Sequence, residues 1–135
     1  MRMTNKTDIP NEVIRDAVRF ARPAGIKRFR VTIVNSKRRW GGWGCKYGVK
    51  IRINTQAKYP CIFKTYQYAQ LRGRRYYLGS LIECLIYLLA HELTHTKQGQ
   101  RGNCRGRVWG ARGRYSEIET ESYAIRKLRE WRRLN

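Results

Sequence analysis

Apolar residues recur at helical spacing near the start of the chain and predict a first helix. Asp8 stands where it can cap this helix, Pro10 falls in its first turn, and the helix is expected to end before Pro23. The apolar positions of the helix are Val13, Ile14, Ala17, Val18 and Ala21. Side chains spaced in this way share one face, so this face should pack against the rest of the domain.

The same spacing predicts two longer helices in the C-terminal half. One begins at Gly79-Ser80 and ends near Gln98-Gly99, where glycine favours a left-handed cap. The other is capped by Ser116 and runs from Glu117 to about Leu134. Their apolar positions are Leu81, Cys84, Leu85, Leu88 and Leu89 in the first, and Ile118, Ala124, Ile125, Leu128 and Trp131 in the second.

Alternation of apolar and polar residues predicts strands between the first two helices. Residues 29–34 and 47–53 alternate in this way and are candidates to pair, with a turn expected at Gly41 to Gly44. Residues 62–66 and 74–78 are candidates for a further hairpin. Helices and strands in these proportions predict one mixed domain without internal repeats.

The helix expected from Gly79-Ser80 to Gln98-Gly99 carries both histidines of the chain, in the motif His91-Glu92-Leu93-Thr94-His95. Residues i and i+4 of a helix project from one face, so His91 and His95 can share one metal ion. The pattern is HExxH, the zinc-hydrolase signature, in which Glu92 is expected to take a proton from the attacking water. The alternative is a helix that carries these residues for packing or solvation alone.

A third protein ligand is expected among the acids, because catalytic zinc sites usually have three. Nine acidic residues exist in the chain, and three of them, Glu117, Glu119 and Glu121, crowd into the start of the last helix. Glu117 and Glu121 share a face, so one can bind the metal while the other orients a ligand. Acids also favour helix N-termini because of the helix dipole, which could account for two of the three.

The chain resembles the zincin metallopeptidases over two segments, residues 90–95 and residues 117–124. The resemblance is to the glutamate-ligated gluzincins and their small ImmA/IrrE-type relatives, in which an AHELxH helix precedes a helix of pattern ExEANxFA whose first glutamate binds zinc. It implies His91, His95 and Glu117 as zinc ligands and Glu121 in a supporting role. Thr120 and Glu121 depart from the Ala-Asn of that pattern, so Glu121 also stays open as the ligand.

The resemblance also implies an architecture, an α+β zincin-like minimal domain over residues 1–135. Its parts would be an N-terminal helix, a small twisted and mostly antiparallel sheet, the HExxH helix and a C-terminal glutamate helix. Residues 59–78 would supply the sheet edge that receives an extended substrate. An oxyanion-stabilising side chain is expected as well, with Tyr115, Tyr123 and several arginines as candidates.

Charge is the second strong feature of the sequence. The net charge is +21, and residues 17–82 contain sixteen Lys and Arg but no acid. Aromatic residues are interleaved with these cations at Trp40, Trp43, Tyr47 and Tyr66. Such a field attracts polyanions, and cations alternating with aromatics suit nucleic acid, DNA or RNA. A solvated basic surface with no such partner is the alternative.

Cysteines and apolar runs bound the setting of the protein. The cysteines are widely spaced and form no CxxC pair, so reduced thiols are expected, although their even number leaves a disulfide open. They are Cys45, Cys61, Cys84 and Cys104. Neither a signal peptide nor a membrane span is apparent, so a location in the cytoplasm or at the nucleoid, with no membrane partner, is expected. The small size of the chain and its mostly loop-borne charge favour a monomer.

Two hypotheses on function follow from these features. The first is a zinc-dependent endopeptidase that acts near nucleic acid; SprT- and Spartan-like proteases, which cut proteins crosslinked to DNA, are a more distant resemblance, but their third ligand is a histidine that this chain lacks. The alternative is a nucleic-acid-binding protein with a structural or regulatory zinc. A peptidase held inactive by its Gly- and Arg-rich segment, residues 100–114, is a third possibility.

Overall fold

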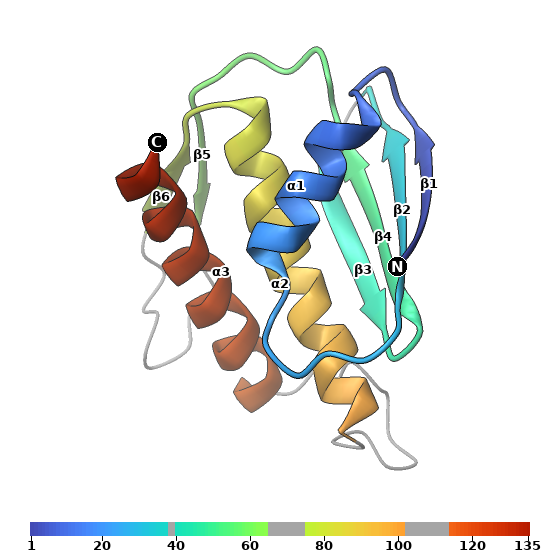
Figure 1. Cartoon of the computed structure of the whole chain (residues 1–135). Coiled ribbons are helices and arrows are strands. Elements are labelled where there is room, and N and C mark those ends of the chain that lie inside the picture. Colours follow the sequence, from blue (N-terminus) through green and yellow to red (C-terminus); the bar gives the residue numbers. More distant parts are fainter. Residues whose placement is uncertain (38–39, 65–74, 102–113) are drawn as a thin grey trace.

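The computed structural model describes residues 1–37, 40–64, 75–101 and 114–135. Along the chain these residues form β1 (Arg2–Lys6), α1 (Asn11–Ala21), β2 (Arg30–Asn35), β3 (Gly41–Cys45), β4 (Gly48–Ile53), β5 (Cys61–Lys64), β6 (Arg75–Leu78), α2 (Leu81–Gln100) and α3 (Arg114–Leu134). Figure 1 shows the three helices beside the sheet. The expected mixture of helices and strands is confirmed.

A four-stranded sheet in the order β1-β2-β4-β3 forms one side of the molecule. Strands β1, β2 and β4 run parallel, and β3 pairs antiparallel with β4 at one edge. The expectation of a mostly antiparallel sheet is therefore wrong. Alternation reveals which face of a strand is buried but not its direction, which is set here by the connections through α1 and β3.

Two of these strands were not expected from the sequence. β1 is short, four of its five residues are polar, and its side chains alternate between exposed and partly buried positions. β3 occupies the glycine-rich segment for which a turn was expected, because its glycines allow the strand to lie close against α2. The pairing expected between residues 29–34 and 47–53 is confirmed, in parallel register.

The expected hairpin of residues 62–66 and 74–78 is present as β5 and β6, which pair antiparallel as a separate two-stranded sheet. The residues between them lie outside the described part of the chain. Because this hairpin does not pair with the four-stranded sheet, the expectation that residues 59–78 supply its edge is wrong. The edge next to α2 is β3.

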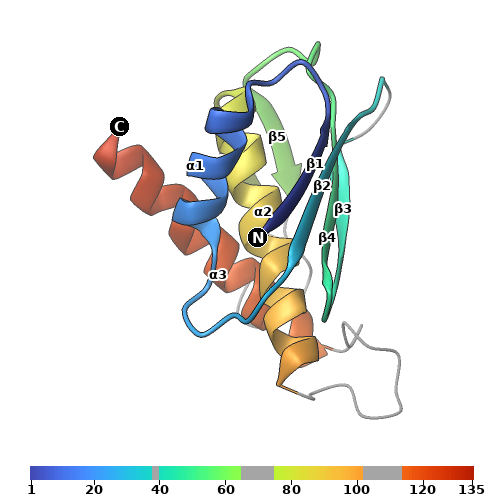
Figure 2. The same cartoon turned by 45° about the vertical axis from the view of Figure 1, so that its right-hand side comes forward.

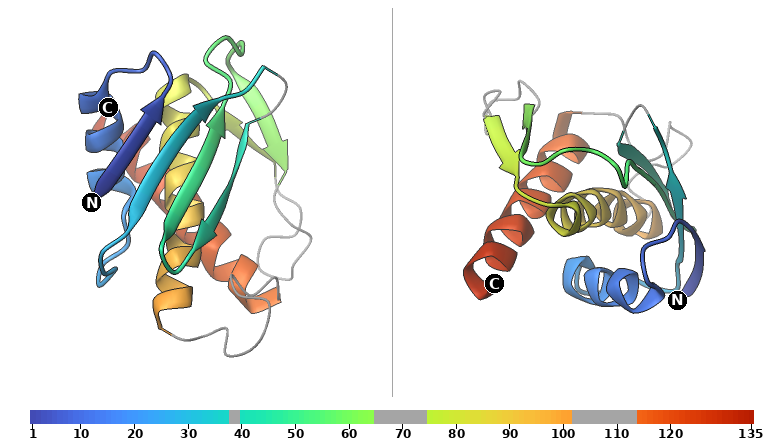
Figure 3. Two further views of the ribbon diagram at one scale, coloured as in Figure 1. Left: turned by 90° about the vertical axis from the view of Figure 1, so that its right-hand side faces the viewer. Right: turned by 90° about the horizontal axis from the view of Figure 1, so that it is seen from above.

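The helices form two layers on a single face of the sheet (Figures 2 and 3). α1 and α2 lie side by side against the sheet, and α3 packs on α2 on the side away from it. α1 ends before Pro23 as expected, but Asp8 does not cap it; its N-cap position is Pro10 and has no side-chain hydrogen bond. α3 begins at Arg114, two residues before the expected cap at Ser116.

The core lies between the sheet and α2. Val31, Ile33 and Ile51 point from the strands toward helix residues such as Leu89 and Leu93, and all five are fully buried. α2 is buried on nearly all sides because it packs between the sheet, α1 and α3. Polar side chains inside such a helix need partners, so those of the HExxH motif must find them in neighbouring elements.

Gln100, the last residue of α2, fixes the lower end of this core. Its side-chain oxygen accepts a hydrogen bond from the backbone N–H of Lys27 at 2.7 Å, and its amide donates to the backbone carbonyl of Lys46 at 3.2 Å. Gly48 begins β4 at φ 154°, where a Cβ would overlap the backbone of Arg30. The loops that precede β2 and β4 are thus hydrogen-bonded to the C-terminal end of α2.

Two further expectations bear on the setting of the protein. Within the described residues, no helix combines the length and the apolar character that crossing a bilayer requires. Cys45, Cys61 and Cys84 are free thiols, and Cys104 lies outside the described part of the chain. Burial raises the pKa of the Cys84 thiol to about 12, so this side chain behaves as a core residue.

Candidate metal centre

The N-terminus of α2 is held by a capping arrangement and by a contact with α3. Ser80 accepts a hydrogen bond from the backbone N–H of Glu83 at 3.2 Å, and the Glu83 carboxylate accepts one from the N–H of Gly79 at 3.0 Å. Arg132 of α3 donates to the same carboxylate at 2.6 Å. With its start held, α2 presents its second half to β3 and α3.

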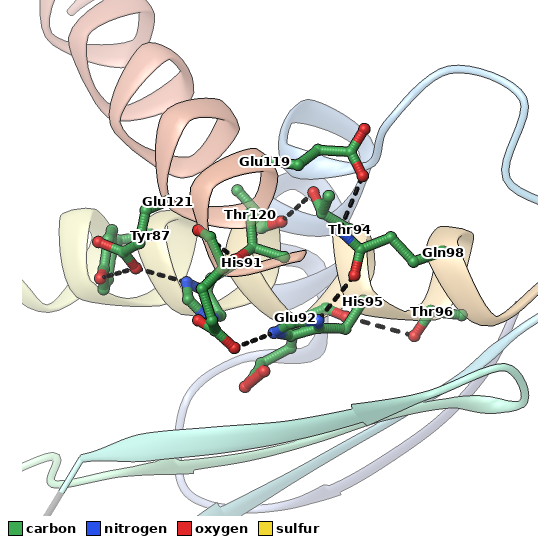
Figure 4. Close-up of polar contacts among 12 residues, drawn as sticks. Tyr87, His91, Glu92, Thr94, His95, Thr96, Gln98, Glu119, Thr120 and Glu121 are labelled. Carbon is green, nitrogen blue, oxygen red and sulfur yellow. Dashed lines mark hydrogen bonds and ion pairs between the residues drawn. The ribbon is translucent and has the colours of Figure 1, made fainter. Parts of the chain in front are cut away.

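His91 and His95 of α2 lie beside α3 (Figure 4), and Glu117 of α3 contacts both of them. Oε1 of Glu117 lies 3.1 Å from Nε2 of His95, and Oε2 lies 3.5 Å from Nε2 of His91. Two ligand atoms held about 2.1 Å from one tetrahedral ion are about 3.4 Å apart, so the observed spacing fits such an ion. The carboxylate and the two imidazoles converge as a three-ligand set would.

Glu121 contacts the other ring nitrogen of His91. Its Oε1 lies 2.5 Å from Nδ1 of His91 and accepts a hydrogen bond from the Tyr87 hydroxyl at 2.5 Å. Because Nδ1 is engaged by a carboxylate, Nε2 is the nitrogen directed at Glu117. This arrangement orients the His91 ring and places Glu121 outside the point where His91, His95 and Glu117 converge.

His95 is oriented by a chain of polar side chains on its opposite side. Its Nδ1 lies 2.9 Å from Oε1 of Gln98, whose amide donates to Glu119 at 2.7 Å. Arg101 donates to the same Glu119 oxygen at 2.7 Å. Partial burial raises the pKa of Glu119, but the hydrogen bonds from Gln98 and Arg101 outweigh this effect and hold it below its ordinary value. Glu119 is therefore an ionised anchor for Gln98.

Glu92 belongs to the same cluster and faces the edge strand. Ligand atoms of His91, Glu92 and His95 all lie within 4.8 Å of one another, so this group could hold a metal ion. The approach of β3 is close because two of its residues are glycines: a Cβ on Gly42 would lie 2.7 Å from Cγ of Glu92, and one on Gly44 would overlap the carbonyl oxygen of Glu92. Glu92 is thus enclosed by backbone.

The cluster carries an excess of negative charge in a buried place. Burial raises the pKa of Glu92; His91 and His95 lower it in part, and Glu117 and Glu121 raise it again. Burial alone would lower the pKa of His91, yet the contact of Nδ1 with the accepting Glu121 carboxylate and the charges of Glu92, Glu121 and Glu117 raise it above its ordinary value. Three carboxylates facing two imidazoles form a donor set that suits a divalent cation.

Comparisons with known proteins add nothing to this geometry. Neither a family model, nor a curated protein, nor a solved structure matches the chain.

The structure brings together all the residues that the sequence singled out for a metal. His91, Glu92 and His95 on α2 lie against Glu117 and Glu121 on α3. For the oxyanion, the Tyr123 hydroxyl instead donates to the backbone carbonyl of Ala21 at 2.8 Å, and the side chain of Tyr115 lies outside the described part. Residues 102–113 of the expected loop also lie outside it.

Sequence reasoning missed two residues that orient the histidines. Gln98 follows His95 by three positions, and Tyr87 precedes His91 by four, so both spacings place the side chains on the histidine face of α2. A search for polar residues at i±3 and i±4 of each histidine would have found them. Glu119 also bears on the orientation of His95, because it accepts the hydrogen bond from Gln98.

Proposed function

We propose that this protein is a zinc-dependent metallo-endopeptidase, with His91, His95 and Glu117 as the metal ligands and Glu92 as the general base. The observation that carries the proposal is the Glu117 carboxylate, which lies 3.1 Å and 3.5 Å from Nε2 of the two histidines of an HExxH helix. The same geometry favours Glu117 over Glu121 as third ligand, because Glu121 engages Nδ1 of His91.

Each residue of the site then has a task in peptide hydrolysis. A zinc ion bound at this site would polarise a peptide carbonyl and acidify a water molecule. Glu92 accepts the proton of the attacking water and passes it to the leaving amine, and burial, which raises its pKa, brings it nearer to the value at which a base works well. Glu121 and Gln98 hold the rings of His91 and His95.

The substrate would bind in extended form along β3. This strand hydrogen-bonds with β4 on one side only, and within the described residues no strand pairs with its other side. A peptide can add to such an edge through its backbone. Since Gly42 and Gly44 lie against Glu92, a peptide bound there would pass close to the catalytic cluster.

The decisive experiment measures zinc per chain on protein purified without added metal, together with cleavage of casein. Wild type should hold about one zinc, Glu117→Ala should lose it, and Glu92→Gln should keep the zinc but lose cleavage. Glu12→Ala, which removes an exposed acid of α1, is the matched control and should change neither. A wild type without zinc after reconstitution would reject the proposal.

A second candidate function is supported by the charge of the molecule. The protein would bind nucleic acid, and a zinc ion at His91 and His95 would stabilise the fold or regulate binding. The supporting observation is the net charge of +21, with no acid among residues 17–82. In that case Glu92→Gln would leave nucleic-acid binding unchanged and no protein substrate would be cleaved. The peptidase would also associate with nucleic acid, through the same basic surface.

A further inference from the structure

One face of the four-stranded sheet is not covered by any element of the described chain. All three helices and the β5-β6 hairpin lie on the other side, and the left view of Figure 3 looks directly onto the open face. The described side chains that alternate inward fill the core, so the remaining positions of β1 to β4 point outward. An open face of this kind is available to a ligand.

The register of the sheet places the outward positions in three rows. In the middle row, Thr4, Thr32, Lys50 and Trp43 lie side by side across β1, β2, β4 and β3. The row on one side of it contains Lys6 and Arg52, and the row on the other side contains Arg2 and Arg30. These rows put five cations on one face.

The charge of this face has a single sign. β1, β2, β3 and β4 contain no acidic residue, and Arg2, Lys6, Arg30, Lys50 and Arg52 are all exposed. In contrast, several cations on the helical side have acidic partners, among them Arg132 with Glu83 and Arg101 with Glu119. The open face therefore repels cations and attracts a polyanion more strongly than the helical side does.

Two aromatic side chains stand exposed among these cations. Trp43 is 56% exposed in the middle row, directly opposite Lys50. Tyr47, in the turn before β4, is 65% exposed and has the Lys46 ammonium 5.1 Å from its ring. Their exposed ring faces are suited to stacking on planar groups.

A hollow continues the face at its lower end. Its volume is about 470 Å³, and its lining comprises Met1, Arg2, Arg28, Phe29, Arg30 and Tyr47. Three of these residues are arginines, which bind phosphate oxygens through paired N–H groups. Tyr47 borders the same hollow, so a phosphate and an adjacent ring could be held together there.

We propose that this open sheet face binds single-stranded nucleic acid, with phosphates on Lys50, Arg52 and the arginines of the hollow, and with bases stacked on Trp43 and Tyr47. Exposed rings distinguish this ligand from duplex, because only unpaired bases offer free faces for stacking. The inference deepens the association with nucleic acid proposed above and rests on it, but it does not depend on the metal centre.

β3 joins this face to the candidate metal centre. Trp43 points to the open face, while its neighbours Gly42 and Gly44 lie against Glu92 on the other side. A nucleic-acid strand bound across the open face would therefore be separated from the metal-centre cluster only by the backbone of β3. This arrangement would bring a protein attached to the nucleic acid to the edge along which it can be cut.

The first test measures binding of a fluorescent thymidine oligonucleotide by anisotropy at a series of salt concentrations. Removing two phosphate contacts in Lys50→Ala/Arg52→Ala should reduce the slope of log affinity against log salt by about 1.4. The matched control, Arg15→Ala/Arg133→Ala, removes two exposed cations on helices and should leave the slope nearly unchanged. Equal slope changes in both pairs would overturn the assignment of the face.

The second test separates stacking from charge. Trp43→Ala should weaken oligonucleotide binding about 5-fold or more, and Trp43→Phe should restore most of it. Neither change should affect heparin, a polyanion without bases, and wild type should bind the single strand more tightly than the same sequence as duplex. Unchanged oligonucleotide binding in Trp43→Ala, an equal loss for heparin, or a preference for duplex would reject the proposal.

These outcomes are separable from failure of the peptidase proposal. Zinc content and casein cleavage should remain at wild-type level in Lys50→Ala/Arg52→Ala, because neither side chain contacts the cluster. Failure of the binding tests with zinc retained rejects this inference alone. Binding as described, in a protein without zinc, rejects the peptidase and leaves the binding face standing.

Discussion

At the scale of single residues, the candidate centre shows how one side chain positions another. His91 and His95 would be free to rotate if only their Nε2 atoms were engaged, but Glu121 and Gln98 hold the opposite nitrogens. Orientation of this kind lowers the entropy lost when a metal binds. The supports are themselves held, Glu121 by Tyr87 and Gln98 by Glu119.

We predict that Gln98→Ala weakens zinc binding about 10-fold or more, because His95 loses the partner that fixes its ring. Zinc affinity is measured by competition with a chelating dye. Gln56→Ala, which removes the same side chain at an exposed position, should leave the affinity at the wild-type value. Equal affinity in Gln98→Ala and wild type would show that this relay does not support His95.

At the scale of elements, the long periodic helices were predictable and the sheet was predictable only in part. α2 and α3 could be predicted because apolar residues repeat over many turns. At the start of α2, Ser80 and Glu83 also form a capping box. Periodicity placed Glu117 and Glu121 on one face of the last helix, but the choice of Glu117 as ligand came only from the resemblance to the zincins. These features are local, so the sequence contains the information directly.

The errors concern properties that depend on tertiary contacts. The direction of β2 and β4 is set by the connections through α1 and β3. The strand conformation of β3 depends on packing against α2, where glycine is needed for contact and not for a turn. Nothing in the spacing of Gly41 to Gly44 distinguishes these two roles. β1 was missed because a five-residue strand at the sheet edge has little apolar content.

The contact of β3 with α2 gives a prediction that contrasts two glycines of the same strand. Gly44→Ala should lower the free energy of unfolding by about 1 to 3 kcal/mol, because the added methyl group meets the Glu92 carbonyl. Gly41→Ala, where a Cβ meets nothing within 4 Å, should be close to neutral. Urea denaturation of the two variants checks this. Similar free energies of unfolding for the two variants would mean that β3 does not pack closely against α2.

At the scale of the whole molecule, the net charge of +21 must be accommodated by a chain of 135 residues. Charge of one sign on the open sheet face and its hollow favours the unfolded chain, in which the cations move apart. Salt shortens the range of this repulsion to about 8 Å at physiological ionic strength. Stability should therefore depend on ionic conditions more than on any single ion pair.

We predict that raising sodium chloride from about 20 to about 300 mM increases the melting temperature by several degrees, the shift expected for about 1 kcal/mol in a domain of this size. Differential scanning fluorimetry measures the shift. Lys50→Ala/Arg52→Ala should show a smaller increase, because it begins with less repulsion. A melting temperature that is constant or falls with salt would contradict the expected role of self-repulsion.

The glycines of β3 have a consequence for selectivity if both proposals hold. Because the strand has no side chain between its backbone and Glu92, only the backbone of β3 separates the binding face from the candidate metal centre. β3 would then limit the distance between the bound nucleic acid and the site of cleavage. Cleavage would be confined to the part of a protein nearest its attachment to the nucleic acid, and proteins that are not attached would be spared by distance alone.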